Sequence, residues 1–182
     1  MSEIKTIGIA GAGTMGAGIA IVCARAGFRT RVFDLNPQSV ERARSQTEGF
    51  LRKSVERGKL AADRLPEIMG QWHGTTQLED LADCDLVIEA VFESLPVKHE
   101  FFGKLNTICP THTIFASNPS TISITEIAGG SGRADRFVGM HFCLPAQLMK
   151  LVEMSPGLVT SDETFARAWA LCEALGQKPV KT

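Results

Sequence analysis

The chain has 182 residues and a formal net charge of −1 at pH 7, with 44% hydrophobic and 21% charged residues. This composition is typical of a globular protein, and the length suits one domain with a well-buried core. The near-zero charge provides no basic field for a nucleic acid, so we expect no nucleic-acid partner. No apolar run reaches the ~18 residues that a membrane-spanning helix needs, so we expect no membrane partner.

The cysteine pattern indicates the compartment. The five cysteines are scattered, and none forms a C-x-x-C pair. An odd number without paired spacing favours neither a disulfide framework nor a zinc site, and it indicates a reducing environment. The first residues, MSEIKTIGIAG, lack the features of a signal peptide. We therefore expect a cytoplasmic protein without a metal site.

Short β-branched segments alternate with segments of helical length. We expect strands near residues 4–10, 29–33, 85–91, 112–117, 137–142 and 149–154, and the last residues, GQKPVKT, resemble the start of another. We expect helices over Met15–Ala26, Pro37–Lys59, Val97–Thr107, a short stretch near Thr125, and Asp162–Leu175. Apolar strands separated by helices predict an α/β fold of the Rossmann type, with a doubly wound, mostly parallel sheet.

One segment is longer than such a crossover needs. ARSQTEGFLRKSVERGKLAADRLPEIMG is charged, has helical character and lies between the second and third of these strands. We predict that residues 37–70 form a helical arm that stands out from the sheet. The chain as a whole, residues 1–182, is then one cofactor-binding domain with this arm.

The stretch GAGTMG follows the first strand directly and opens the first helix. Gly11, Gly13 and Gly16 give the G-x-G-x-x-G spacing, which permits a tight turn, a close approach of a pyrophosphate and close packing of helix on strand. We expect these glycines, together with Thr14 and Met15, to bind a dinucleotide at the helix N-terminus. The alternative is a glycine-rich turn without a ligand.

An acidic residue follows at the distance that this fingerprint requires. Asp34 ends the second strand, eighteen residues after Gly16. A carboxylate there accepts hydrogen bonds from ribose hydroxyls and repels a 2′-phosphate, so we predict NAD(H) rather than NADP(H). Arg31 lies nearby, but the alternation of the strand places it on the other side. Asp34 as a simple cap of the next helix is the alternative interpretation.

The stretch FVGMHFCLPAQLMKLVEM brings two titratable residues to apolar strands. His141 is carried by the first run and Glu153 by the second. One interpretation is a core histidine and a surface carboxylate. The other is a catalytic pair, in which the imidazole exchanges a proton with a substrate and the carboxylate fixes its tautomer.

Three further motifs, DLVIEAVFESLPVK, ASNPSTISIT and HFCLPAQLMKLVE, occur in this order. With the glycine loop, they make the whole chain resemble the N-terminal domain of the L-3-hydroxyacyl-CoA dehydrogenases, the bacterial 3-hydroxybutyryl-CoA dehydrogenases in particular. The resemblance implies an NAD-dependent oxidoreductase that interconverts L-3-hydroxyacyl-CoA and 3-ketoacyl-CoA. It places the catalytic roles on His141, Glu153 and Ser120, with Ser120 bonding the substrate oxygen.

The resemblance also implies binding residues. Contacts to NAD fall on Glu93, Lys98 and Asn118, and Asn118 and Ser120 face the substrate; Lys98 as a solvated helix charge is the alternative. In the arm, a lysine of the family falls on Arg57, which keeps the charge for a CoA phosphate, and Lys53 is a further candidate. The alternative is that these arm cations only make the surface soluble and bind no ligand.

Some positions depart from the family pattern. Leu144 stands where the family has an asparagine after the histidine, and Pro119 stands where it has a threonine. A serine of the family that contacts CoA falls on Phe50. These changes leave the three catalytic candidates intact, but they bear on substrate preference and turnover.

In the family a helical C-terminal domain follows, with most of the dimer interface, and these 182 residues do not include it. We therefore expect a full-length homodimer formed through that domain. The 182-residue domain should bind NAD, show little turnover alone and expose an apolar patch where the second domain docks. Two alternatives stay open: a non-catalytic NAD-binding member of the family, as in an eye-lens crystallin, and a dehydrogenase for 3-hydroxy acids without CoA, whose base is usually a lysine.

Overall fold

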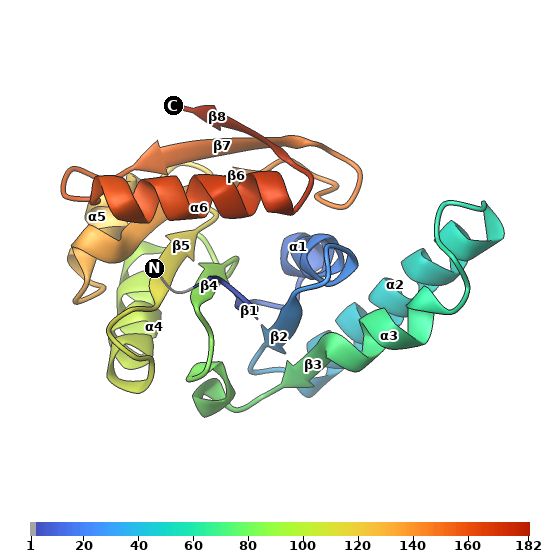
Figure 1. Ribbon diagram of the computed structural model, residues 1–182. Coiled ribbons are helices and arrows are strands. Elements are labelled where there is room, and N and C mark those ends of the chain that lie inside the picture. Colours follow the sequence, from blue (N-terminus) through green and yellow to red (C-terminus); the bar gives the residue numbers. More distant parts are fainter. Residues whose placement is uncertain (1–2) are drawn as a thin grey trace.

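The computed structural model describes residues 3–182 as an eight-stranded sheet with helices on both faces (Figure 1). In chain order its elements are β1 (Thr6–Ala10), α1 (Thr14–Arg25), β2 (Arg29–Phe33), α2 (Pro37–Glu56), α3 (Arg64–Gln71), β3 (Trp72–Thr75), η1 (Leu78–Leu81), β4 (Leu86–Glu89), α4 (Leu95–Ile108), β5 (Ile114–Ser117), α5 (Ile124–Gly129), η2 (Ala134–Arg136), β6 (Phe137–Phe142), β7 (Leu151–Pro156), α6 (Asp162–Ala174) and β8 (Lys178–Lys181).

The strand order is β3-β2-β1-β4-β5-β6-β7-β8, and every neighbouring pair is parallel except β6 and β7. The predicted doubly wound, mostly parallel sheet is therefore confirmed. β6 and β7 are antiparallel because only the short segment 143–150 joins them, and a parallel pair needs a longer crossover. Residues 178–181, where the sequence suggested the start of a strand, form β8 on the edge of the sheet.

Two hydrophobic cores lie on the two faces of the sheet. One packs α1, α6 and part of the arm against β1 and β4, with Ile9, Ile19 and Leu171 among its buried members. The other packs α4 and α5 on the opposite face, around Phe102 and Phe115. Burial on both faces explains why the central strands are largely apolar, and every residue of β1 is buried. Among residues 3–182, no helix has the length and apolar character that crossing a lipid bilayer requires.

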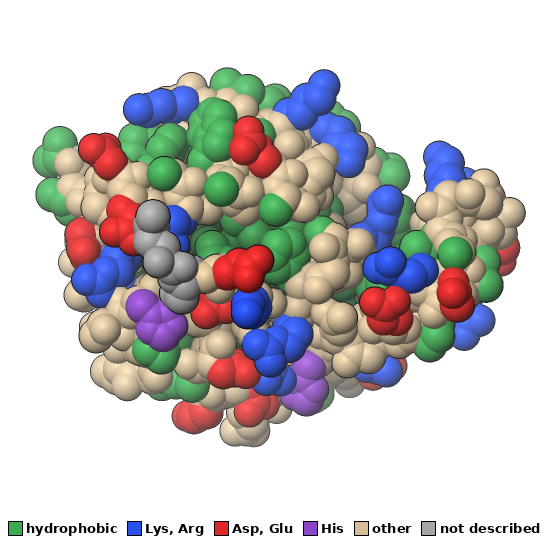
Figure 2. Space-filling model, viewed as in Figure 1, with side chains coloured by type: hydrophobic (Ala, Val, Ile, Leu, Met, Phe, Trp, Pro, Cys, Tyr) green, Lys and Arg blue, Asp and Glu red, His purple; other side chains and the backbone are tan. Residues whose placement is uncertain are grey.

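The predicted arm is a pair of helices, α2 and α3, that projects from the sheet (Figure 1). The expected single helix over Pro37–Lys59 was too long, because α2 ends at Glu56 and Gly58 follows with φ +67°, a conformation that favours glycine and ends a helix. Only Ala43, Thr47 and Leu51 of α2 are buried. Figure 2 shows Lys and Arg side chains over the arm, interspersed with acidic ones.

Candidate functional site

The glycine loop between β1 and α1 has the geometry that its spacing predicts. Gly11 has φ +101°, and a Cβ there would lie 2.5 Å from the carbonyl oxygen of Ala90. A Cβ on Gly16 would lie 1.7 Å from the carbonyl oxygen of Gly11, so the first turn of α1 packs directly on the loop. At Gly13, in contrast, a Cβ would meet nothing within 4 Å. The backbone is therefore open to a ligand only at the middle glycine.

The N-terminus of α1 is suited to an anion. Gly13 is its N-cap, no side chain caps the helix, and its first turn contains no acidic residue. Thr14 is exposed and Met15 half-buried at this end. The backbone N–H groups of the first turn and the positive end of the helix dipole are thus available to the phosphates of a dinucleotide.

Asp34 joins the glycine loop to the end of β2. Its Oδ2 accepts a hydrogen bond from the Ala12 N–H at 2.8 Å, and its Oδ1 accepts one from the Asn36 N–H at 2.9 Å. The interpretation of Asp34 as the cap of α2 is wrong, because Asn36 is that cap and accepts from the Gln38 N–H. Arg31 pairs with Asp83 at 2.7 Å rather than with this carboxylate.

His141 and Glu153 face each other across the antiparallel pair β6–β7, where they are direct register partners. The distance between His141 Nδ1 and Glu153 Oε2 is 2.8 Å, and both side chains are partly exposed, by 34% and 42%. His141 is therefore not a core histidine. With Nδ1 held by the carboxylate, Nε2 is the ring nitrogen left for a substrate.

The three catalytic candidates line one cavity of about 330 Å³. It is formed by residues 119–125 on one side and by His141, Glu153, Ser155 and Pro156 on the other. Ser120 is exposed in the loop after β5. Asn118, two residues earlier, accepts a hydrogen bond through Oδ1 from the Phe142 N–H at 2.7 Å, which ties this loop to the residue after His141. The structure thus brings Ser120, His141 and Glu153 together, with Asn118 beside them.

Glu93 and Lys98 lie behind this loop. Lys98 is completely buried, so the interpretation of a solvated helix charge is wrong. Its Nζ lies 3.0 Å from Glu93 Oε2, and Glu93 Oε1 accepts the N–H groups of Ser120 and Thr121. Burial alone would raise the pKa of the Glu93 carboxyl, but the Thr121 N–H, the Lys98 ammonium and the Ser120 N–H lower this pKa to about 2. The expected contacts of Glu93 and Lys98 with NAD stay predictions.

Sequence reasoning missed Glu89, which binds Lys98 from β4, and Ser117, which donates a hydrogen bond to Glu89 from β5. Their only signal was a glutamate inside an otherwise apolar strand, DLVIEAV. An acid in such a run needs a buried partner, and the lysine nine residues later provides it.

The arm keeps its candidate residues away from this cluster. Lys53 and Arg57 are exposed on the last turn of α2 and at its C-cap. Phe50 is half-buried, and the Arg25 guanidinium lies over its ring, 5.6 Å from the centroid. Phe50 therefore packs the arm onto α1, and a role in binding CoA stays a prediction for Arg57 and Lys53.

The other histidines have structural partners. His99 Nε2 lies 2.7 Å from the Glu126 carbonyl oxygen, and His73 and His112 lie 3.9 Å from Asp80 and Asp85. Within residues 3–182, no three His, Cys, Asp or Glu side chains gather as a metal site would require.

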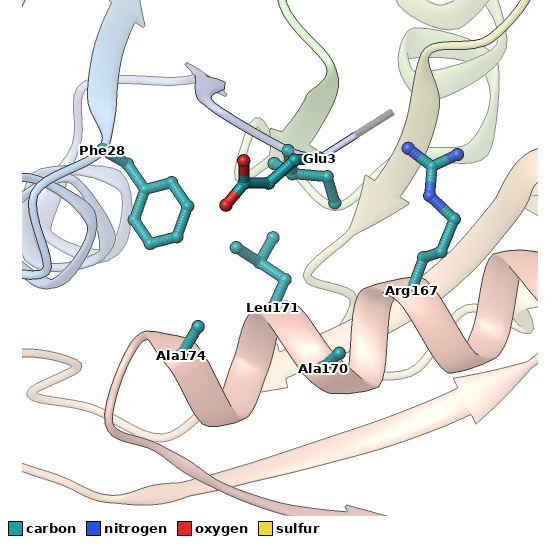
Figure 3. Close-up of a pocket in the computed structure, with 7 residues that line it drawn as sticks. Glu3, Phe28, Arg167, Ala170, Leu171 and Ala174 are labelled. Atoms are coloured by element: carbon teal, nitrogen blue, oxygen red, sulfur yellow. The ribbon is translucent and has the colours of Figure 1, made fainter. Parts of the chain in front are cut away.

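A second cavity of about 330 Å³ lies between Phe28 and the helix α6 (Figure 3). Its walls are Ile4, Phe28 and one face of α6 around Leu171, with Glu3 and Arg167 also lining it. None of the predicted site residues lines this cavity, so the cavity between β6, β7 and the loop after β5 is the candidate active site.

Comparison with known proteins agrees with this geometry. The family described as 3-hydroxyacyl-CoA dehydrogenase, NAD binding domain, matches residues 6–182. The chain belongs to this family. The cofactor of the 3-hydroxyacyl-CoA dehydrogenase NAD-binding domain is NAD, as the glycine loop and Asp34 predicted.

Named relatives of this 3-hydroxyacyl-CoA dehydrogenase domain are longer than the chain. A probable 3-hydroxybutyryl-CoA dehydrogenase of Bacillus subtilis is 42% identical over 179 residues, which are 98% of the chain and 62% of the relative. A 3-hydroxyadipyl-CoA dehydrogenase of Escherichia coli is 38% identical over the whole chain and 38% of its own length. The chain thus spans less than two thirds of these relatives.

Solved structures give the same result. The crystal structure of 3-hydroxybutyryl-CoA dehydrogenase from Escherichia coli K12 superposes with a TM-score of 0.96 and 38% identity, over 99% of the chain and 38% of that protein. The (S)-3-hydroxybutyryl-CoA dehydrogenase from Ralstonia eutropha gives a TM-score of 0.95 and 38% identity, over 98% of the chain and 63% of that protein.

Proposed function

We propose that this domain binds NAD(H) and supplies the acid–base residue for the interconversion of L-3-hydroxyacyl-CoA and 3-ketoacyl-CoA. The observation that carries the proposal is the 2.8 Å contact between His141 Nδ1 and Glu153 Oε2, in a cavity that Ser120 also lines. The names of the relatives support 3-hydroxybutyryl-CoA and acetoacetyl-CoA as the substrate pair.

His141 is the base in oxidation and the acid in reduction. Its Nε2 takes the proton of the 3-hydroxyl, while Glu153 keeps the ring in this tautomer and stabilises the imidazolium that forms. Ser120 donates a hydrogen bond to the substrate oxygen, a contribution of roughly 2–4 kcal/mol in comparable sites. When bound, NAD would supply the acceptor for the hydride of the carbinol carbon, and Ser120, His141 and Glu153 would position the substrate for that transfer.

The proposed cofactor site follows the carboxyl ends of the strands. Gly13 and the first turn of α1, where the backbone is open, would hold the pyrophosphate, with Gly11, Gly16, Thr14 and Met15 contributing. Asp34 would accept hydrogen bonds from the adenosine ribose, and Glu93, Lys98 and Asn118 would serve the nicotinamide end. Leu35 and Phe92 follow β2 and β4 with 83% and 79% of their surface exposed. Exposed apolar side chains at these positions suit contact with an adenine ring.

In this proposal the helical arm binds the CoA moiety of the substrate. Arg57 and Lys53 are exposed cations that pair with its phosphates. In this proposal a further helical domain completes the site and forms a homodimer, and the chain covers only 62% of the Bacillus subtilis relative. Large exposed apolar side chains on β7, β8 and their flanking loops, among them Leu148, Leu158 and Val180, suit its docking. The free cysteines support a cytoplasmic location.

One pair of residues favours the alternative of an NAD-binding protein without turnover. Leu144 is 56% exposed near His141, and Pro119 lines the cavity beside Ser120. Both replace polar residues of the family pattern with apolar ones, so polar contacts to the substrate are fewer.

Oxidation of NADH by acetoacetyl-CoA decides between the two functions. It is measured for the chain alone and for the chain joined to the helical domain of a relative. The proposed dehydrogenase gives turnover in the joined protein and little in the chain alone. NADH binding without turnover in either protein contradicts the proposal and supports the non-catalytic alternative.

A further inference from the structure

A buried ionic cluster lies under the proposed active site. Glu89 ends β4, Ser117 ends β5 beside it, and Lys98 reaches both from α4; all three side chains are fully buried. Lys98 Nζ lies 2.9 Å from both carboxylate oxygens of Glu89. The Ser117 hydroxyl donates to Glu89 Oε2 at 2.6 Å, and the Val91 N–H donates to Glu89 Oε1 at 2.8 Å.

The same lysine contacts the loop of the proposed catalytic serine through one more residue. Lys98 Nζ lies 3.0 Å from Glu93 Oε2. Glu93 Oε1 then accepts hydrogen bonds from three consecutive backbone N–H groups, those of residues 120, 121 and 122, at 2.9, 3.0 and 3.3 Å. Glu93 is thus held by a cation on one side and holds the loop on the other.

We propose that Glu89 and Ser117 are positioning residues for the loop 120–122. They fix Lys98, Lys98 fixes the Glu93 carboxylate, and this carboxylate fixes the backbone that presents Ser120 to the cavity with His141. The expected effect on turnover rests on the function proposed above. The expected effect on the loop 120–122 does not depend on that function.

Physical chemistry explains why the cluster acts as a unit. A buried ammonium group is stable only with compensating charges and hydrogen bonds, and here two carboxylates and a nearby hydroxyl surround it. Loss of one buried partner changes the hydrogen bonding of the others, because the low dielectric of the interior strengthens the coupling between them. Glu89 and Ser117 lie in strands of the sheet, which hold their backbone in place. The backbone of loop 120–122 is therefore the part that changes when the cluster is altered.

Amide hydrogen exchange of the chain, read by peptide mass spectrometry, tests the loop directly. Ser117→Ala removes one hydrogen bond, and Glu89→Gln removes the buried charge. Glu100→Gln is the matched control, because Glu100 pairs with Lys104 on the exposed face of the same helix. We expect exchange of residues 120–122 to become about fivefold faster or more in the first two variants and unchanged in the control.

Unchanged exchange at residues 120–122, or acceleration confined to α4, overturns the proposal, because the cluster then only anchors the helix. If Glu89→Gln does not fold, Ser117→Ala decides by the same criteria. Kinetics of the joined protein provide a second readout: kcat falls about fivefold or more, a larger change than that in the Kd for NADH. A faster loop with unchanged kcat overturns the positioning role, and a wild-type protein without turnover contradicts the proposed function alone.

Discussion

His141 and Glu153 are direct neighbours across the antiparallel strands β6 and β7, with Nδ1 and Oε2 2.8 Å apart. They are twelve positions apart in the sequence, and the short loop 143–150 brings the two strands into register. The pair is therefore built on the sheet itself rather than on a mobile loop, which keeps the imidazole orientation fixed.

The first prediction concerns the proposed base. His141→Gln keeps a polar side chain of similar size but removes the titrating group, so turnover of acetoacetyl-CoA by the joined protein falls by about 10²–10⁴. The Kd for NADH stays within about twofold, because the ring does not bind the dinucleotide phosphates. His112→Gln, which removes an exposed histidine near Asp85, serves as the control and leaves both quantities unchanged. Full activity of His141→Gln contradicts the mechanism.

The second prediction separates the glycines of the loop. In Gly13→Ala, the new methyl group meets no protein atom and the φ of −71° suits alanine, so the chain folds normally. It occupies the space proposed for the pyrophosphate, so NADH affinity falls about tenfold or more. Calorimetry or fluorescence of this variant and of Gly49→Ala, an open helical glycine in α2, measures the difference. Equal NADH affinity in the two variants would contradict the placement of the pyrophosphate at Gly13.

Gly16→Ala gives the opposite result. Its Cβ would lie 1.7 Å from the Gly11 carbonyl oxygen, so helix and loop must separate. We expect a loss of about 3 kcal/mol or more in the free energy of unfolding, measured by urea denaturation. A stable Gly16→Ala chain would show that α1 does not pack on the loop as described.

These contrasts show what the sequence could and could not predict. The spacing of Gly11, Gly13 and Gly16 predicted the turn because Gly11 and Gly16 each meet a local steric demand, whereas Gly13 leaves space open for a ligand. β3 was missed because WHGT is short and lacks an apolar pattern. The role of Lys98 was ambiguous because a helical lysine is usually solvated, and only the pairing of β4 with β5 brings Glu89 and Ser117 against it. Contacts between distant strands depend on tertiary packing, which local spacing does not encode.

The third prediction concerns pH. The pKa of Glu93 is about 2 in the folded chain and near 4.5 in the unfolded chain. A depressed pKa stabilises the fold fully above pH 4.5, and the stabilisation is lost as the pH falls towards 2. Its size is roughly 2–3 kcal/mol. Urea unfolding of the wild type and Glu93→Gln at several pH values should show a stability difference that shrinks over this window. A stability difference that does not change with pH would mean that the negative charge of Glu93 does not stabilise the folded chain.

The fourth prediction concerns the thiols. Burial raises the pKa of Cys109 to about 11 and that of Cys172 to about 12, and it raises the pKa of Cys23 and Cys84 well above their usual range. Cys143 is the half-buried one. A thiol reagent should therefore label one cysteine in the native chain and all five after denaturation. Cys143→Ser removes the fast reaction; rapid labelling of a second thiol would contradict the burial described for the two cores.

The fifth prediction concerns cofactor choice. Asp34→Asn keeps one oxygen for the Ala12 N–H but removes the charge that repels a 2′-phosphate. The preference for NADH over NADPH should fall about tenfold or more. Asp83→Asn, which releases Arg31 at the surface, is the control and keeps the preference. A preference unchanged in Asp34→Asn would assign the discrimination to other residues.

The most direct test of the central claim is a fluorescence titration of this chain with NADH and, in parallel, with NADPH. The NAD-binding site formed by the glycine loop, α1 and Asp34 predicts saturable binding of NADH at least about tenfold tighter than of NADPH. Binding of neither nucleotide by a chain shown to be folded by circular dichroism would contradict it.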